Sequence, residues 1–441
     1  MNIARAGALA KLPIEEIKKT IQNHTRLVTE GLPDKRLKRV IEDMVLGILG
    51  GETPVITEMA RQNSKTEGES WAVAKRIYRL LENKQVQTGQ LYEGLYQAGC
   101  EMVEREKPAY LVAAVDPVNF EKPYVQSMEG ASIVHKSTPP DLSGHARLAH
   151  GYPAITATIV NTSVPVTSYA NWFSYKVGFI SQNKEIEQAF TTTCRLYPGY
   201  IIRFVGDAGL DDQKMFAQVG RLQQEFVFRA SHLERIVEVY NERLDRWETE
   251  ALQDLTETVP YQVAFKVLFK HAGRTRLDTV QCGWFQIRLP EYPGQVLWVL
   301  VANNPHFKQP LVLITNVPLE TIPIVQQVYN DWRLRGQIEH GYRFDQEQGL
   351  DVEDMRVQSL DRMRRLFAII LLSAQIVFVI GQYWPPKAVL WLRQLGGKLG
   401  LAADRDGPYW LLRGISAVIT SAMTLSFIFL HPFPFAEATY G

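Results

Sequence analysis

The pattern of hydrophobic and polar positions changes character partway along this chain of 441 residues. In the first part, apolar residues recur at helical spacing in the segments 36–49 and 70–86. Gly50, Gly51 and Pro54 separate these two segments, as residues that interrupt helices do. We therefore predict an N-terminal helical domain over residues 1–108.

From Tyr110 onward, short and nearly continuous apolar runs indicate buried strands. Strands are predicted within residues 110–117, 154–161, 162–173, 200–207, 225–231 and 310–317. Helices are predicted at 182–196, at 213–223, from about 319 to 348, and from about 360 to 380. Strands that alternate with helices in this way predict an α/β fold.

Residues 234–309 interrupt this alternation. Apolar and polar residues alternate there between turns rich in glycine, proline and arginine, which predicts a small antiparallel sheet. The predicted layout is an N-terminal helical domain (1–108), an α/β core in two parts (109–233 and 310–382), a β-rich insertion (234–309) and a C-terminal helical tail (383–441).

Composition and charge narrow the class of protein only slightly. The formal net charge is +1, so any nucleic-acid surface must come from local clusters of basic residues. Three cysteines lie far apart without zinc-binding spacing, which favours a reduced cytoplasmic protein. The apolar stretches 366–380 and 417–430 are shorter than the roughly 20 residues of a membrane-spanning helix. We predict buried helices there and no membrane partner, with membrane segments as the alternative.

Two carboxylates directly follow predicted buried strands. Asp116 ends the run YLVAAVD, and Asp207 ends the run YIIRFVGD. Because open α/β folds place their sites at the carboxyl ends of strands, both are candidate catalytic residues. The alternative is that each caps a turn or a helix. Asp211 and Asp212 follow closely and are predicted to cap the next helix.

A third acid lies in the predicted helix that begins near residue 319. At about 100° per residue, five positions fall within roughly one quarter of the helix circumference. These positions hold Trp332, Arg335, Glu339, Tyr342 and Gln346. Aromatic and polar groups surround one acid here, whereas a stripe at this spacing is usually apolar. The alternative is a simple ion pair between Arg335 and Glu339 on one helix.

The segment WRLRGQIE (332–339), with Tyr342 and Gln346, resembles the Y-x2-R-x3-E-x6-K signature of DDE transposases of bacterial insertion sequences, in the type-four family. VAAVDPV (112–118) and FVGDAGLDD (204–212) resemble the two aspartate motifs of that family. The similarity extends over about residues 110–380. Tyrosine, tryptophan and lysine are usual in the family at three positions where this chain has Trp332, Gly336 and Gln346.

The resemblance implies a ribonuclease-H-like catalytic core in which Asp116, Asp207 and Glu339 are the catalytic residues and hold two Mg²⁺ ions, which Mn²⁺ can replace. Two metal ions about 4 Å apart can activate a nucleophile and stabilise a leaving oxygen at a phosphodiester. The implied activity is cleavage at the terminal inverted repeats of a transposon and strand transfer into target double-stranded DNA. The DNA contacts would come from the rest of the stripe: Arg335, Trp332, Tyr342 and Gln346.

We further expect a homodimer in the DNA complex and a location in the bacterial cytoplasm, at the nucleoid. One alternative is a DNA-binding protein derived from a transposase and no longer catalytic. Another is an unrelated α/β hydrolase, for which the sequence contains no supporting motif.

Other candidate DNA contacts are basic and aromatic. Lys75, Arg76 and Arg79 stand close together on a predicted helix, where either DNA contact or a solvated face is consistent with the sequence. Trp284 and Trp298 lie in the predicted insertion, where they could stack on a flipped base or pack in the core. The insertion also carries a basic cluster that could form a phosphate-binding edge or a solvated turn: Lys266, Lys270, His271, Arg274 and Arg276.

Overall fold

The first part of the chain is helical, as its pattern predicts. The computed structural model describes residues 12–64, 67–122, 128–136, 147–241, 244–271, 274–305, 307–337, 349–397 and 407–430. The N-terminal helices are α2 (Ile14–Thr29), α3 (Lys35–Gly51), α4 (Ile56–Arg61), α5 (Glu67–Glu82) and α6 (Thr88–Glu106). Local chemistry sets their ends. Asp34 caps α3 by accepting a hydrogen bond from the Arg36 amide at 2.8 Å, and Glu52 ends α3 in the left-handed conformation.

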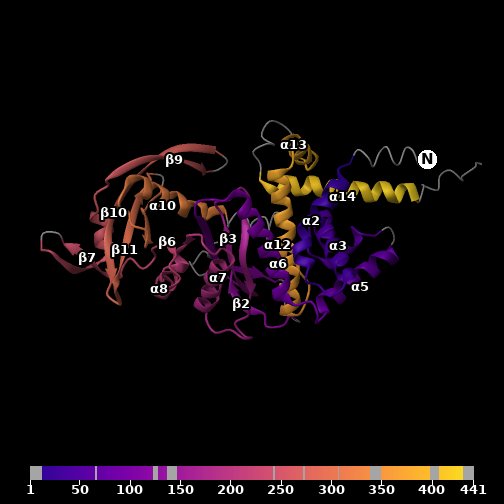
Figure 1. The fold of residues 1–441 in the computed structure, drawn as a ribbon, viewed down its shortest axis with the longest axis horizontal. Coiled ribbons are helices and arrows are strands. Elements are labelled where there is room, and N and C mark those ends of the chain that lie inside the picture. The colour runs from indigo at the N-terminus through magenta and orange to yellow at the C-terminus, as the bar shows by residue number, and fades with distance from the viewer. Residues whose placement is uncertain are drawn as a thin grey trace, which may run out of the picture.

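Helices from the end of the chain complete this helical region. α12 (Leu360–Tyr383) packs against α2, α3 and α6, and α14 (Pro408–Leu430) packs against α3 (Figure 1). α13 (Pro386–Leu395) lies between them in sequence. By length and composition α12 could cross a membrane, but 78% of its most apolar window is buried inside the protein. The stretch 366–380 is therefore the core of a buried helix, as predicted. The stretch 417–430 lies in α14, which keeps one face, at Thr420 and Ser421, exposed.

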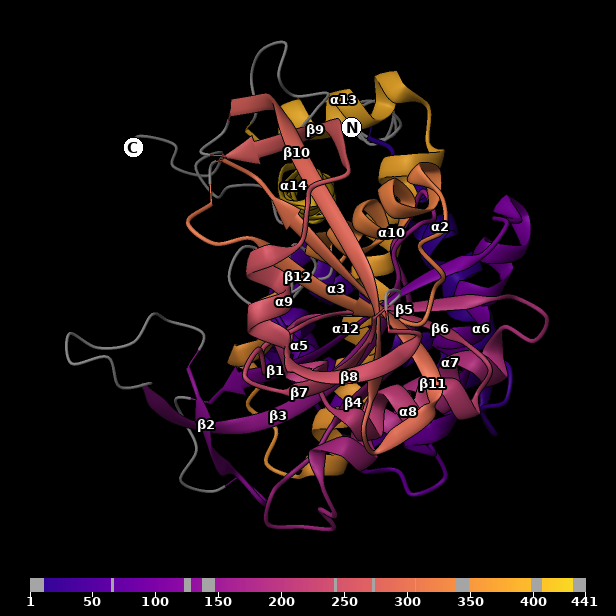
Figure 2. The same ribbon diagram turned by 90° about the vertical axis from the view of Figure 1, so that its left-hand side faces the viewer.

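The described strands form one hydrogen-bonded sheet of twelve strands. They are β1 (Leu111–Glu121), β2 (Ser132–His135), β3 (Leu148–Ile159), β4 (Val166–Trp172), β5 (Ile202–Gly206), β6 (Glu225–Arg229), β7 (Ile236–Asn241), β8 (Arg246–Ala251), β9 (Val263–His271), β10 (Arg274–Leu289), β11 (Tyr292–Asn303) and β12 (Leu311–Thr315). Their order is β2-β3-β1-β5-β6-β12-β11-β10-β7-β8, with β4 on β3 and β9 on β10. β1, β5 and β6 are parallel, and all other pairings are antiparallel. The sheet twists strongly, so β3 and β10 run in clearly different directions in Figure 2.

The strands within residues 234–309 are antiparallel, as predicted, but they are continuous with the central sheet. β11 pairs with β12 over five residues, from Trp298 opposite Thr315 to Ala302 opposite Leu311, and so joins the same sheet as β6. Alternation along a strand reports which side chains are buried, but it does not report which strand lies alongside. The strands β7 to β11 therefore extend the central sheet, and they form the end of the molecule opposite the helical region (Figure 1).

Helices cover both faces of the parallel strands. Successive side chains of β1 point to opposite faces of the sheet, so they pack in two different hydrophobic cores. Ala113 packs in the core that contains α7 (Gln182–Leu196) and α8 (Gln213–Arg221), whereas Val112 packs in the core that contains α10 (Ile322–Leu334). The predicted helices at 182–196 and 213–223 are therefore present, and this part of the chain is a mixed α/β structure.

The predicted helix at 319–348 differs from the observed one. α10 begins at Ile322 and ends at Leu334, Arg335 lies in a turn, and residues 336–337 are again helical. Residues 338–348 lie outside the described part of the chain. The stripe of polar and aromatic residues is thus interrupted at Arg335. The remaining elements are α9 (Leu252–Thr258) and the short 3₁₀ helices η2 (Ala208–Leu210) and η3 (Val352–Asp354).

Candidate active site at the carboxyl edge of the parallel strands

Asp116 and Asp207 lie at corresponding positions on neighbouring parallel strands. The paired register of β1 and β5 ends with Ala114 opposite Val205, so two further steps along each strand bring Asp116 opposite Asp207. Neighbouring strands are about 4.8 Å apart. Both carboxylates are half-buried. The sheet therefore places two of the three predicted catalytic acids side by side at one edge, which fits the need of Mg²⁺ for oxygen ligands.

Asp207 also has the capping role that we considered as the alternative. Its Oδ1 accepts a hydrogen bond from the Gly209 amide at 2.8 Å, at the start of η2. This bond fixes the direction of the carboxylate at the end of β5. Asp207 can therefore cap η2 and still bind a cation, because its carboxylate has two oxygens that can each accept a hydrogen bond or coordinate a cation.

The end of α10 approaches the same edge. The indole Nε1 of Trp332 donates a hydrogen bond to the carbonyl of Gly206 at 3.0 Å, and Gly206 directly precedes Asp207. The guanidinium of Arg335 lies 5.6 Å from the centre of the Trp332 ring. The structure therefore brings Trp332 next to the strand end that carries Asp207, although Trp332 is partly buried against the core under α10, and Arg335 follows it at the end of that helix.

A buried ion-pair network, absent from our predictions, holds α10 on the sheet. Asp331 accepts a hydrogen bond from Nη1 of Arg203 at 2.5 Å and a bifurcated one from the Tyr110 hydroxyl, whose oxygen lies 3.0 Å from each carboxylate oxygen. Arg203 also bonds Glu225 at 2.6 Å, and the side chains of Arg203 and Asp331 are each only 7% exposed. Burial raises the pKa of Asp331, and the Arg203 guanidinium opposes that shift. An arginine inside the apolar run YIIRFVGD was the available signal for this network.

Arg229 is a second residue that sequence reasoning missed. The register of β5 and β6 ends with Gly206 opposite Phe228, so the next positions are Asp207 and Arg229. The Arg229 side chain is exposed. A basic residue thus stands beside the acid pair at the same edge, where an anionic strand could be bound.

The remaining members of the predicted stripe lie outside the described residues: Glu339, Tyr342 and Gln346. Within the described ranges no group of three or more histidine, cysteine, aspartate or glutamate side chains is arranged to hold a metal ion. The structure thus describes a pair of candidate metal ligands, and the third ligand stays a prediction.

The predicted basic helix face is exposed. Lys75, Arg76 and Arg79 all lie on the solvent side of α5. Trp71, on the same helix, is 55% exposed, and the Lys75 ammonium lies 5.4 Å from the centre of its ring. A surface that combines cations with an exposed aromatic ring is suited to phosphate and base contacts.

The predicted contacts in the β extension are only partly accessible. Trp284 on β10 and Trp298 on β11 are half-buried and pack against the core under α10, which is the packing alternative for both. Lys266 and Arg276 are exposed. The side chains of three further members of that basic cluster lie outside the described residues: Lys270, His271 and Arg274.

The two acids after Asp207 have different roles. Asp212 caps α8 by accepting a hydrogen bond from the Lys214 amide at 2.7 Å, as predicted. The Asp211 side chain does not cap α8, contrary to the prediction. It accepts bonds from the amides of Ser231 and His232 at 2.7 and 2.9 Å and pairs with Arg235 at 2.8 Å. These partners are about twenty residues away in sequence, so no local pattern indicated them.

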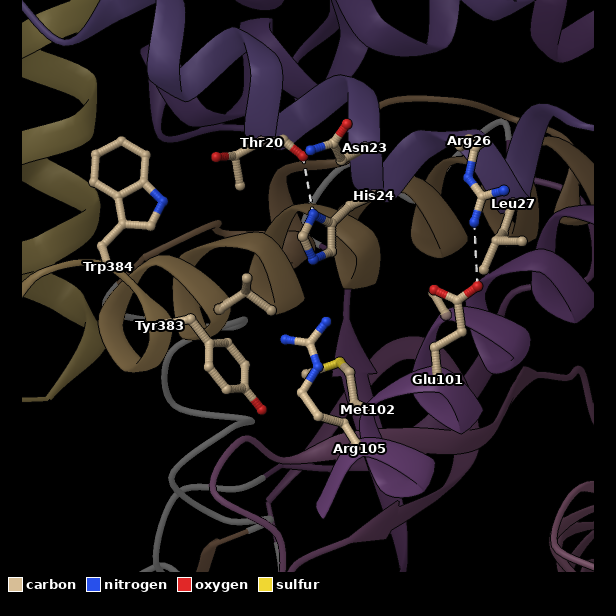
Figure 3. Close-up of a pocket in the computed structure, with 12 residues that line it drawn as sticks. Thr20, Asn23, His24, Arg26, Leu27, Glu101, Met102, Arg105, Tyr383 and Trp384 are labelled. Carbon is tan, nitrogen blue, oxygen red and sulfur yellow. Dashed lines mark hydrogen bonds and ion pairs between the residues drawn. The ribbon is translucent and has the colours of Figure 1, made fainter. Parts of the chain in front are cut away.

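A cavity of about 390 Å³ lies between α2, α6 and the end of α12, and none of the predicted site residues that the structure describes lines it (Figure 3). His24 donates a hydrogen bond through Nδ1 to the Thr20 carbonyl at 2.9 Å, and burial lowers its pKa. Arg26 pairs with Glu101 at 3.2 Å. Because these interactions partly neutralise its basic side chains, the cavity is not specifically suited to an anion.

Comparison with known proteins adds little. No family model and no curated protein matches the chain. Among solved structures, the chain is similar to the cryo-EM structure of a piggyBac transposase synaptic complex with hairpin DNA. The TM-score is 0.44 and the sequence identity is 8%, over 90% of this chain and 74% of that chain. A similarity of this size carries no argument about function.

Proposed function

We propose that this protein is a DNA transposase with a ribonuclease-H-like core, which cleaves strands at transposon ends and transfers them into target DNA. The observation that supports the proposal is the position of Asp116 opposite Asp207 on parallel strands, next to the end of α10. Neither aspartate is unusual alone. Together at one edge of the sheet, and with the glutamate predicted just after α10, they would supply the several oxygen ligands that a divalent cation requires.

In this proposal each described residue has a definite task. Asp116, Asp207 and the undescribed Glu339 would hold Mg²⁺, which when bound supplies an activated nucleophile and stabilises the leaving oxygen. Asp207 is oriented by the Gly209 amide. Arg229 and Arg335 would bind phosphates of the strand beside the acids. Trp332 fixes the end of α10 against β5 and so sets the position of Arg335.

The catalytic part is tested with Asp116→Asn and Asp207→Asn. Each should lower metal-dependent cleavage of a duplex carrying the flanking inverted repeats by about 10³-fold, which corresponds to several kcal/mol of transition-state stabilisation. Asp254→Asn is a matched control, because Asp254 is an exposed acid on α9. Cleavage at the normal rate by either strand-end variant would remove that residue from the site. A wild-type protein that binds the repeats without cleaving them would favour the non-catalytic alternative.

The DNA-binding part is tested on α5. The triple variant Lys75→Gln/Arg76→Gln/Arg79→Gln should bind duplex DNA more weakly. The slope of log affinity against log salt should fall by about 0.9 for each phosphate that the variant leaves without a cationic partner. The control is Lys35→Gln/Arg36→Gln/Arg39→Gln, which removes one lysine and two arginines from exposed positions of α3. Equal affinities and slopes for the two triple variants would show that the α5 face is only a solvated surface.

A further inference from the structure

The helices α7 and α8 pack side by side (Figure 1). A second cavity is lined by residues of both helices and by Tyr292 at the start of β11. Its volume is about 440 Å³. Asn183 near the start of α7 donates a hydrogen bond to Asp212, the cap of α8, at 3.0 Å, so the two helix starts are held together. α8 follows Asp207 through η2, but among the residues with described positions no predicted site residue lines this cavity.

The side chains that line the cavity carry more positive than negative charge. Lys184, Lys214 and Arg221 contribute the cations, and Glu187 is the acid among the lining residues. Glu187 pairs with Lys184 at 2.9 Å, while Arg221 donates a hydrogen bond to the neutral side-chain amide of Gln218. Lys214 and Arg221 thus add positive charge that Glu187 does not offset. The net charge of the whole chain is only +1, so this excess is a local property.

Apolar and aromatic side chains border the same cavity. Ile180 is 78% exposed and Tyr292 is 37% exposed, although both are large and apolar over most of their surface. An aromatic ring beside cations is the combination that binds a nucleic-acid strand, because the ring stacks on a base or sugar while the cations bind phosphate. A free phosphate would need the cations but not the ring.

We propose that this cavity binds a phosphate group of a nucleic-acid strand, with Lys214 and Arg221 contacting the phosphate and Tyr292 contacting the adjacent base. The identity of that strand as DNA rests on the proposed function. The cavity would hold the strand on the α7–α8 side of the sheet, as a contact additional to those beside Asp116 and Asp207.

The test compares Lys214→Gln/Arg221→Gln with Lys107→Gln/Lys387→Gln. The second pair removes the same charge from exposed lysines that do not line the cavity. Binding of a labelled single-stranded oligonucleotide is measured by fluorescence anisotropy at several salt concentrations, and binding of inorganic pyrophosphate by calorimetry. The cavity variant should bind both at least about tenfold more weakly, and its salt slope should fall by about 0.7 for each phosphate left without a cationic partner. The control should match wild type.

Tyr292→Leu separates the two sources of phosphate. It should weaken oligonucleotide binding by about 5- to 150-fold and leave pyrophosphate binding unchanged, since the ring stacks on a base and pyrophosphate has none. If Lys214→Gln/Arg221→Gln weakened only pyrophosphate binding, the cavity would be a site for a small phosphate compound. The proposal that it binds a nucleic-acid strand would then be wrong. Equal binding by both double variants would overturn the site itself. Loss of strand binding in a protein whose wild type never cleaves DNA would sustain this inference while the proposed function failed.

Discussion

At the scale of single residues, Lys122 is a deeply buried charge with several backbone partners. It directly follows β1, which carries Asp116, and its side chain is 2% exposed. Its ammonium donates hydrogen bonds to the carbonyls of Val352 and Glu353, each at 2.8 Å. Lys122 thereby links the end of β1 to η3 through hydrogen bonds. In sequence, η3 follows the segment outside the described residues that contains Glu339.

Burial lowers the pKa of Lys122 to about 7 from its ordinary value of 10.5, and the nearby Glu353 opposes the shift. Between these two values the unfolded chain binds more protons than the folded chain. The free energy of unfolding should therefore rise with pH from about 7 to 10, by at most about 1.4 kcal/mol per pH unit, and should lose this contribution as pH falls toward 7.

Lys122→Met tests this dependence. The difference in unfolding free energy between wild type and Lys122→Met, measured by urea denaturation at pH 7, 8 and 9, should grow with pH. At pH 7 the variant also leaves two buried carbonyls without their donor, which costs about 1–3 kcal/mol each. Lys107→Met, at an exposed lysine, should show no pH-dependent difference. Parallel pH profiles for wild type and Lys122→Met would contradict the shifted pKa.

At the scale of elements, the last turn of α10 binds two strands of the sheet, β5 and β9. Asp331 binds Arg203 of β5, Trp332 binds the carbonyl at the end of β5, and Arg333 donates a hydrogen bond to the Leu268 carbonyl of β9 at 2.5 Å. Consecutive residues of a helix point about 100° apart, so one turn can contact strands that lie in different directions. The position of α10 next to the acid pair follows from these contacts.

Asp331→Leu is expected to lower the free energy of unfolding by about 3–5 kcal/mol, because it leaves Arg203 buried without its closest acid. Adding Arg203→Met should recover much of that loss, since two apolar side chains replace a buried pair. Urea unfolding of the wild type, both single variants and the double variant gives the coupling free energy directly. Strictly additive losses would show that Asp331 and Arg203 do not depend on each other.

At the scale of the whole molecule, the sheet runs without a break from β2 to β8. The core under α10 contains Val112 and Val205 from the parallel strands together with Val280 and Leu300 from the extension. The two parts therefore share backbone hydrogen bonds and a hydrophobic core. Among the described strands, β8 lies at the far edge of the sheet, where it pairs with β7.

Native-state hydrogen exchange should reflect this arrangement. Peptides from β6, β12 and β11 should exchange in one cooperative unit, because β12 lies between the other two strands. Peptides from β7 and β8 should exchange faster, since they form the end of the sheet and have few buried side chains. Earlier exchange of β11 than of β6 and β12 would mean that the extension is an independent unit, despite the continuous pairing.

Local patterns were sufficient for much of the element assignment. The bounds of α7 and α8 follow from helical spacing and from the caps Ser181 and Asp212, whose effects extend only a few residues. The buried strands before Asp116 and Asp207 follow from short apolar runs. These features depend on neighbours in sequence, so the sequence by itself determined them, together with the two acids at strand ends as candidates.

Tertiary structure alone decided how these pieces meet. It set Asp116 opposite Asp207 and Arg229 beside them, because strand order and register arise from contacts between segments distant in sequence. It also placed Arg203 against Asp331 and joined β11 to β12. The periodicity of apolar residues indicates which face of a helix or strand is buried. It does not indicate which other element packs against that face, since any apolar surface of suitable shape could do so.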